Sequence, residues 1–358
     1  MINVTKPFLP PQAEYEAYLS GIWGRVWLTN NGPLVNELEA GLKEFLKVDN
    51  FLFLTNGTIA IQIAIKALRL QGEIITTPFS YVATTSSVVW EGCTPVFADI
   101  DPQTLNIDPA KIEAAITSKT SAILATHVYG NPCDIDAIAA IAQKHNLKVI
   151  YDGAHSFGSK YKGKSVFGYG DVTTASFHAT KLFHTVEGGG VFANDPELLD
   201  TMDFMRNFGH NGPEQFEEAG INGKNSEFHA AMGIVNLKWA DRILESRRLQ
   251  SERYDKKLAG LNVSRIKYNP DEFNYSYYPI IFETEAQLLA SVDLLNANWV
   301  YPRRYFYPGL NSLKYVNPVD MPISDSISKR VICLPLYYGL TNEEIDFVSG
   351  ILLKARNS

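Results

Sequence analysis

A lysine between an apolar run and a glycine cluster carries the most chemical information in this chain. The segment Ser176-Phe-His-Ala-Thr-Lys181 is followed by glycines at 188–190, and Asp152 ends a predicted strand upstream. Pyridoxal phosphate chemistry needs a lysine amine for a Schiff base and a carboxylate that pairs with the pyridinium nitrogen. Lys181 and Asp152 supply both groups, so the pair predicts an enzyme that moves an amino group.

The surroundings of Lys181 strengthen this interpretation. Most lysines are solvated surface residues. Here the flanking residues are uncharged, and the glycines at 188–190 permit close approach of the backbone to a ligand. Burial would lower the pKa of the lysine amine and favour its nucleophilic form.

Other candidate residues have both a chemical and an ordinary structural interpretation. Asp152 is at the end of a predicted strand, where α/β proteins bind ligands, but Asp also caps helices and turns. His155 could face the same pocket or be a hydrogen-bonded surface group. Gly57 and Thr58 form a strand-to-helix junction that could bind a phosphate through backbone N–H groups, or an ordinary turn. Tyr81 could stack on a flat ring or belong to the core.

The elements that would position these residues alternate over the first two-thirds of the chain. Strands are predicted at 73–77, 95–99, 121–127, 147–152 and 190–193, and helices at 58–70, 108–116 and 134–145. This alternation predicts a mostly parallel sheet covered by helices, with ligands beyond the carboxyl ends of the strands. Further helices are expected within 195–209, 228–258 and 285–298, a strand at 274–282, and a last helix that starts at the capping box Thr341–Glu344.

Size and composition exclude several classes of protein. The 358 residues suggest a large α/β domain at 1–244 and a small α+β domain at 245–358. A net charge of −7 without a basic block argues against nucleic-acid binding. Apolar runs are too short for a membrane span, and the amino-terminal residues lack the apolar region of a signal peptide. Three cysteines without metal-site spacing argue against a zinc site or disulfide framework, so a cytoplasmic protein is expected.

Nearly the whole chain resembles the DegT/StrS sugar-nucleotide aminotransferases. The resemblance implies the fold of fold-type I (aspartate aminotransferase-like) pyridoxal phosphate enzymes. It is carried by the motifs Trp27-Leu-Thr-Asn-Asn-Gly-Pro33, Asn56-Gly-Thr58, Pro78-Phe-Ser-Tyr-Val-Ala-Thr84, Pro95-Val-Phe-Ala-Asp-Ile-Asp101, His127-Val-Tyr-Gly-Asn-Pro132, Asp152-Gly-Ala-His155 and Ser176-Phe-His-Ala-Thr-Lys181.

The resemblance implies roles for individual residues. Lys181 would form the Schiff base and Asp152 would contact the pyridinium nitrogen. The remaining cofactor contacts would come from His155 at the phenolic oxygen, Tyr81 on the ring, and Gly57, Thr58 and Ser176 at the phosphate. Asn222 matches an asparagine that reaches the cofactor of a neighbouring subunit, which implies a homodimer with shared active sites. Lys224 stands where many relatives have arginine.

The substrates implied are L-glutamate and a nucleotide-linked keto-6-deoxy sugar. Residues expected at the sugar nucleotide are Thr29, Tyr129, Glu187, Arg303, Arg304 and Tyr307, and guanidinium groups pair well with pyrophosphate oxygens. The segment 301–308 lacks a histidine that several 3-amino-sugar enzymes carry, so it resembles the subgroup that makes dTDP-4-amino-4,6-dideoxy-D-glucose. A 3-keto acceptor, a UDP-linked sugar and a destination in O-antigen, another glycan or an antibiotic stay open.

Two other classes of protein are compatible with this fold. Sugar dehydratases of the family replace the lysine, typically with histidine, and Lys181 argues against that class. A non-catalytic sensor would lose the Lys181–Asp152 pair or add a DNA-binding segment, and neither is seen. A dinucleotide-binding dehydrogenase is disfavoured because no G-x-G-x-x-G follows an early strand.

Overall fold

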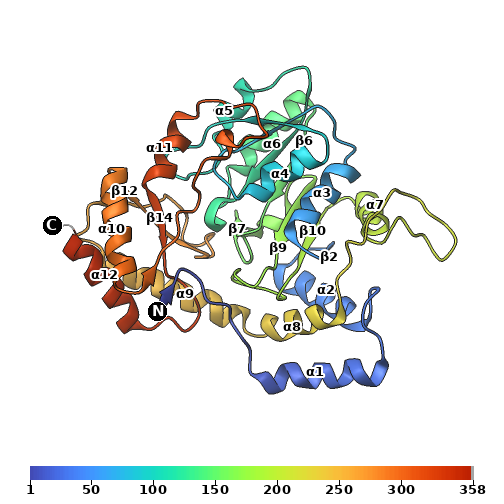
Figure 1. Cartoon of the computed structure of the whole chain (residues 1–358). Helices are drawn as coiled ribbons and strands as arrows, with labels where there is room; N and C mark the ends of the chain where they lie inside the picture. The colour runs from blue at the N-terminus through green and yellow to red at the C-terminus, as the bar shows by residue number, and fades with distance from the viewer. Residues whose placement is uncertain (356–358) are drawn as a thin grey trace.

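A seven-stranded sheet forms the centre of the molecule in the computed structural model, which describes residues 1–355 (Figure 1). One strand, β10, runs antiparallel to its two neighbours, and the other strands are parallel to one another. This confirms the predicted mostly parallel sheet. In spatial order the strands are β2 (Leu52–Leu54), β10 (Gly189–Phe192), β9 (Val172–Ser176), β6 (Lys148–Asp152), β5 (Thr120–Thr126), β3 (Glu73–Thr76) and β4 (Thr94–Phe97).

Helices cover both faces of this sheet, so its central strands are apolar on both sides. Successive residues of β5 show the alternation: Leu124 packs in the cluster that contains α3, α4 and α7, and Ile123 packs in the cluster that contains α5 and α6. The helices of this part are α1 (Gln12–Arg25), α2 (Pro33–Leu46), α3 (Gly57–Ala67), α4 (Val82–Trp90), α5 (Pro109–Ala114), α6 (Ile135–His145), α7 (Pro196–Arg206) and α8 (Glu227–Leu237). Within residues 1–355, none of the helices has the length and apolar character that crossing a membrane requires.

A smaller α+β part follows and confirms the expected fold class. It holds a three-stranded antiparallel sheet in the order β11 (Val263–Ser264), β12 (Tyr278–Phe282), β14 (Val331–Leu334), with the helices α9 (Ala240–Lys257), α10 (Glu285–Ala297), α11 (Pro322–Arg330) and α12 (Asn342–Ala355). The amino-terminal strand β1 (Ile2–Asn3) pairs with β13 (Val300–Tyr301) and so joins this part. A hairpin, β7 (Lys160–Tyr161) with β8 (Lys164–Ser165), completes the strands. The domain boundary at residue 245 stays our proposal.

Two sequence predictions need correction. The helix expected over 228–258 is two helices, α8 and α9. The α-helical hydrogen-bond pattern is interrupted at Trp239, because its N–H donates to the carbonyl of Asn236, three residues back. The Trp239 ring packs on Phe8, a long-range contact that the sequence pattern does not show. The strand expected over 274–282 begins only at 278. Before it, Tyr275 has a positive φ of 54°, and the Asn274 side chain binds backbone carbonyls rather than extending the sheet.

Candidate active site

A cavity of about 680 Å³ opens at the carboxyl edge of the large sheet. It is lined at the ends of three strands by Thr126 at the end of β5, Asp152 at the end of β6 and Ser176 at the end of β9, and by Gly57 at the start of α3. The loop 303–306 of the smaller part closes another side. The site therefore lies where parallel α/β sheets place their ligands.

Lys181 lies in the loop between β9 and β10, and its side chain reaches the cavity. The loop is held at its base because the N–H of Phe177 donates to the carbonyl of Gly188 at 2.7 Å, and the N–H of Thr185 donates to that of Phe177 at 2.9 Å. Burial lowers the pKa of the Lys181 amine to about 8, although the Asp152 charge opposes this shift. A sizeable fraction of the amine is therefore neutral, and nucleophilic, close to neutral pH.

Asp152 and His155 lie beside this lysine. The Asp152 carboxylate is only 5% exposed, and it accepts hydrogen bonds from the Thr84 hydroxyl at 2.7 Å and the Ala154 N–H at 3.0 Å. The His155 ring stacks on Phe306, with centroids 5.7 Å apart. Burial, and then the Lys181 charge, hold the pKa of His155 well below its usual value, so the ring is neutral. Its Nδ1 atom has no hydrogen-bond partner among residues 1–355 and is free to bind a ligand.

The start of α3 supplies a place for an anion. Asn56 caps the helix by accepting the N–H of Ile59 at 2.9 Å. A Cβ on Gly57 would lie 2.9 Å from the Cβ of Ser176, so a glycine is required where helix and strand meet. Gly57, Thr58 and Ser176 all line the cavity. Backbone N–H groups at a helix start, with two hydroxyls beside them, form a phosphate site of a common kind.

Four of the six residues predicted to bind substrate line one of two adjoining cavities. Arg303 and Glu187 line the cavity, as does Tyr81, which is 59% exposed at the start of α4. Arg304 and Tyr307 line a neighbouring cavity of about 420 Å³ that shares Tyr81 and Arg303 with the first.

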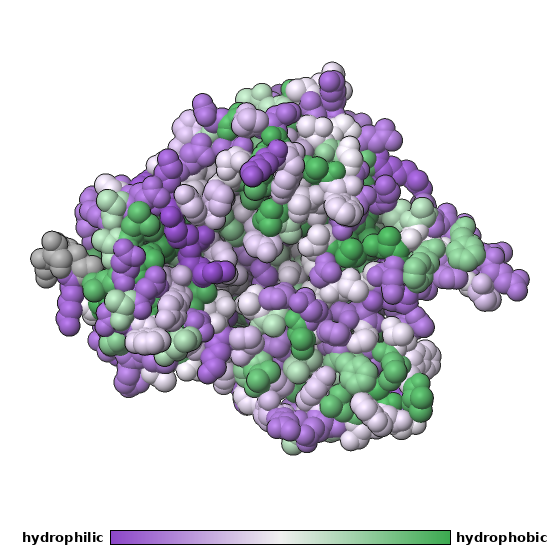
Figure 2. Space-filling model, viewed as in Figure 1, coloured by the Kyte–Doolittle hydropathy of each residue, from purple (hydrophilic) through white to green (hydrophobic). Residues whose placement is uncertain are grey.

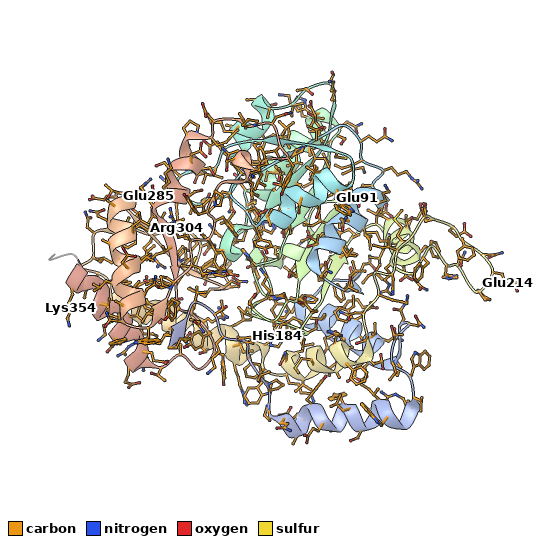
Figure 3. The ribbon with its side chains drawn as sticks, in the orientation of Figure 1. Glu91, His184, Glu214, Glu285, Arg304 and Lys354 are labelled. Atoms are coloured by element: carbon orange, nitrogen blue, oxygen red, sulfur yellow. The ribbon has the colours of Figure 1, made fainter. Side chains whose placement is uncertain are left out.

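The two adjacent arginines have different partners. Arg304 donates to the Glu285 carboxylate at 2.7 Å, and Figure 3 shows these two side chains together beside α10. The side chain of Arg303 has no hydrogen bond or ion pair within residues 1–355; only its backbone pairs, with Cys333. Arg303 is therefore the guanidinium that is free to meet a ligand.

Three other predicted residues do not line either cavity. Tyr129 is fully buried, and its hydroxyl donates to the carbonyl of Tyr305, so it supports the wall rather than facing the opening. Thr29 and Asn222 are exposed on other parts of this chain. Asn222 lies at the base of the arm 207–222, which projects beside α7 with Glu214 at its tip (Figures 1 and 3).

Several residues of the cavity escaped sequence reasoning. Ser80, Thr126 and His178 line it through polar side chains, and Tyr277 and Phe306 through aromatic rings. Two of these lie inside motifs quoted from the sequence, Ser80 beside Tyr81 and His178 between Ser176 and Lys181, and Thr126 directly precedes the motif that begins at His127. The motifs were therefore the available signal. Tyr277 and Phe306 come from the smaller part, and no local pattern connects them to the strand ends.

Comparison with known proteins agrees with this geometry. The model of the DegT/DnrJ/EryC1/StrS aminotransferase family matches residues 12–353. The chain is 43% identical over 355 residues, with 97% of each chain covered, to a dTDP-4-amino-4,6-dideoxy-D-glucose transaminase of Shigella dysenteriae. It is 39% identical over 366 residues, with 98% of each covered, to the protein of the same name from Escherichia coli.

The fold is also similar to that of a solved structure. The crystal structure of DesI in the presence of its TDP-sugar product matches with a TM-score of 0.93 and 31% identity, and the match covers 99% of this chain and 93% of that one. Family, fold and site geometry point the same way: this chain belongs to the DegT/DnrJ/EryC1/StrS aminotransferase family and is an aminotransferase.

Proposed function

We propose that this enzyme uses pyridoxal phosphate to transfer the amino group of L-glutamate to dTDP-4-keto-6-deoxy-D-glucose. The products are 2-oxoglutarate and dTDP-4-amino-4,6-dideoxy-D-glucose. The observation that carries the chemistry is a lysine with a pKa of about 8 beside a buried aspartate in one cavity. The choice of sugar is supported by the 43% identity to a transaminase named for that product.

The residues present fit pyridoxal phosphate. The cavity offers a phosphate site at the start of α3, a carboxylate at the end of β6, and the amine of Lys181 in the adjoining loop. The buried Nδ1 of His155 has no hydrogen-bond partner among residues 1–355, and Tyr81 presents an exposed ring at the mouth. Together these five groups are the kinds of contact that a phosphorylated, nitrogen-containing aromatic aldehyde needs.

When bound, pyridoxal phosphate supplies an aldehyde that an amine can capture and a ring that accepts an electron pair. The Lys181 amine would hold the cofactor by capturing this aldehyde. Lys181 would also be the base that removes the proton from Cα of glutamate, because burial lowers its pKa to about 8 and leaves a sizeable fraction of the amine neutral near that pH. Asp152 would pair with the ring nitrogen, and neutral His155 would contact the phenolic oxygen. In the second half-reaction the same Lys181 amine returns a proton to the sugar carbon that receives nitrogen.

The sugar nucleotide enters past the loop 303–306. Arg303, whose side chain has no partner among residues 1–355, meets the pyrophosphate, because a guanidinium forms two parallel hydrogen bonds to phosphate oxygens. Glu187 lies in the cavity as an acceptor for sugar hydroxyls. Arg304 keeps its ion pair with Glu285 and supports the loop from behind.

The active form is a homodimer in which each subunit completes its partner's site. The residues that lie outside this chain's own cavity, Thr29 and Asn222, are exposed next to apolar side chains that a partner would cover. Figure 2 shows such apolar side chains over the end of α1 and near the arm; those exposed there are Trp23, Val26, Trp27, Leu28, Phe208, Phe216 and Ile221.

A cytoplasmic location is part of the proposal, since all three cysteines are free and buried.

The test is the absorption spectrum of the purified protein before and after L-glutamate. We expect a long-wavelength band from cofactor attached to Lys181, which glutamate converts to the pyridoxamine phosphate spectrum and the keto sugar nucleotide restores. A bound cofactor that glutamate leaves unchanged would contradict the amino donor. Absence of any band after pyridoxal phosphate is added would contradict the whole assignment.

A further inference from the structure

A row of three buried hydroxyl groups leads to Asp152. The Thr84 hydroxyl donates to Oδ2 of Asp152 at 2.7 Å, Ser80 lies 2.8 Å from Thr84, and Thr126 lies 3.0 Å from Ser80, each measured between oxygens. Thr84 is fully buried, and the other two hydroxyl residues are 2% exposed. The row connects α4, the turn before it and the end of β5 to the end of β6. Thr84 is the member of the row that contacts the carboxylate, and Ser80 and Thr126 are connected to it through Thr84.

Counting protons gives the row a direction. A hydroxyl group has one proton to donate and can accept from others. Because Thr84 gives its proton to Asp152, the bond between Thr84 and Ser80 must use the proton of Ser80. The bond between Ser80 and Thr126 must then use the proton of Thr126. All three protons point toward the carboxylate, and such aligned hydrogen bonds polarise and strengthen one another.

The second oxygen of the carboxylate is also held. The N–H of Ala154 donates to Oδ1 at 3.0 Å, so both oxygens of Asp152 are fixed by groups on different elements. Each carboxylate oxygen can accept more than one hydrogen bond. Asp152 therefore keeps acceptor capacity for a ligand in the cavity that it lines, while its plane cannot rotate freely.

We propose that Thr84 is a positioning residue for the cofactor, which it serves by aligning Asp152 through the polarised row Thr126–Ser80–Thr84. The inference rests on the proposed function, because it takes the ring nitrogen of pyridoxal phosphate as the partner of Asp152. The row fixes the carboxylate before the cofactor arrives, and preorganised groups bind more tightly than mobile ones. Loss of the Thr84 hydroxyl would free one carboxylate oxygen and leave the Ser80 proton without its acceptor.

The next residue of α4 offers a matched control. Thr85 is fully buried like Thr84, but its hydroxyl has no hydrogen-bond partner within residues 1–355. Thr85→Val therefore makes the same chemical change at the neighbouring residue and leaves the hydrogen bonds of the row intact. Thr84→Ser keeps the hydroxyl and removes only a methyl group, so it should rescue what Thr84→Val loses.

The experiment measures the dissociation constant of pyridoxal phosphate for each cofactor-free protein, and the melting temperature of the same cofactor-free samples. We expect Thr84→Val to raise the dissociation constant roughly tenfold, the scale of one hydrogen bond to a charged group. Thr84→Ser and Thr85→Val should stay within about twofold of the wild type. Should Thr84→Val fail to fold, Ser80→Ala replaces it, with an expected rise of a few-fold because the bond from Thr84 to Asp152 survives.

The outcomes separate this inference from the proposed function. Wild-type affinity in Thr84→Val, or equal losses in Thr84→Val and Thr85→Val, overturns the role of the row while the wild type still binds cofactor. Wild-type affinity in Ser80→Ala overturns it in the same way if that variant is the one measured. A wild-type protein that binds no pyridoxal phosphate overturns both the inference and the function.

Discussion

The two ends of the cavity are built differently. At the cofactor end, Asp152 and Ser176 are at the ends of parallel strands, and Gly57 is packed between a helix and a strand. At the proposed substrate end, Arg303 and Tyr307 are exposed and belong to the loop after β13. Strand ends and the short loop 177–188 hold the groups proposed to perform chemistry, while a surface loop holds those proposed to contact the substrate. Variation at the second end can change the sugar without disturbing the first.

The largest expected effect breaks the cofactor end. Lys181→Ala removes both the attachment of the cofactor and the base, and we expect no measurable turnover, since a positioned base alone accounts for about 10²- to 10⁴-fold. Turnover is measured with L-glutamate and the keto sugar nucleotide, and the amino-sugar product is expected to stay bound to the cofactor. Lys164→Ala, at an exposed lysine on β8, is the control and should keep wild-type activity. Full turnover in Lys181→Ala would contradict the assignment of this lysine.

The next prediction tests the substrate end on its own. Arg303→Ala should raise the KM for the sugar nucleotide about tenfold to a hundredfold, because a guanidinium–phosphate contact of this kind is lost. The half-reaction with glutamate should proceed at the wild-type rate, since Arg303 does not contact Lys181 or Asp152. Single-turnover spectra of each half-reaction measure the two effects separately. Equal damage to both half-reactions would show that Arg303 supports the whole cavity.

Sequence reasoning worked unequally at the two ends, for a physical reason. Asp152 and Gly57 could be located because strand ends and helix starts leave local patterns in the sequence. Thr84 could not, since its partners Asp152 and Ser80 are joined to it only by the folded arrangement of α4 and β6. At the substrate end Arg303 and Arg304 are neighbours with identical side chains.

The difference between these two arginines is decided by α10. Glu285, 19 residues before Arg304, binds one guanidinium and leaves the other free. No periodicity around residues 303–304 indicates which arginine this carboxylate binds.

The strand β9, which carries Ser176 to the site, was also missed as a strand, because Val172-Thr-Thr-Ala-Ser176 has only one large apolar residue. The fold class could still be predicted correctly, because the strand–helix alternation is repeated many times along the chain.

A pH dependence sharpens the account of the cofactor end. Burial lowers the pKa of Lys181 from 10.5 to about 8, and only the neutral amine attacks the cofactor aldehyde. The rate of pyridoxal phosphate attachment to the cofactor-free protein should therefore rise with pH and level off above about 8, with a roughly tenfold fall for each unit below. Stopped-flow absorbance gives this rate. A midpoint near 10.5 would mean that the amine is solvated in the cofactor-free state.

The same shift affects folding with a defined sign. Between pH 8 and 10.5 the unfolded chain keeps the Lys181 proton while the folded chain has lost it. The unfolded state then binds more protons, so the free energy of unfolding contributed by this group rises with pH across that window.

His155 should add no step to the pH profile of the attachment rate between pH 6 and 8, because burial and the Lys181 charge keep the imidazole neutral there.

The smallest effect on the KM for the sugar nucleotide is expected at Arg304, whose guanidinium already has partners. Arg304→Ala should leave the KM for the sugar nucleotide within about twofold, because its guanidinium already binds Glu285 at 2.7 Å and the carbonyl of Lys329 at 3.1 Å. It should lower the free energy of unfolding by about 1 kcal/mol or less, the range for a partly exposed ion pair. Urea denaturation measures this change, and Glu285→Gln should reproduce it. If Arg304→Ala instead raised the KM as much as Arg303→Ala does, the ion pair would have to open when substrate binds, and the substrate end would be a larger and more mobile region than the two cavities suggest.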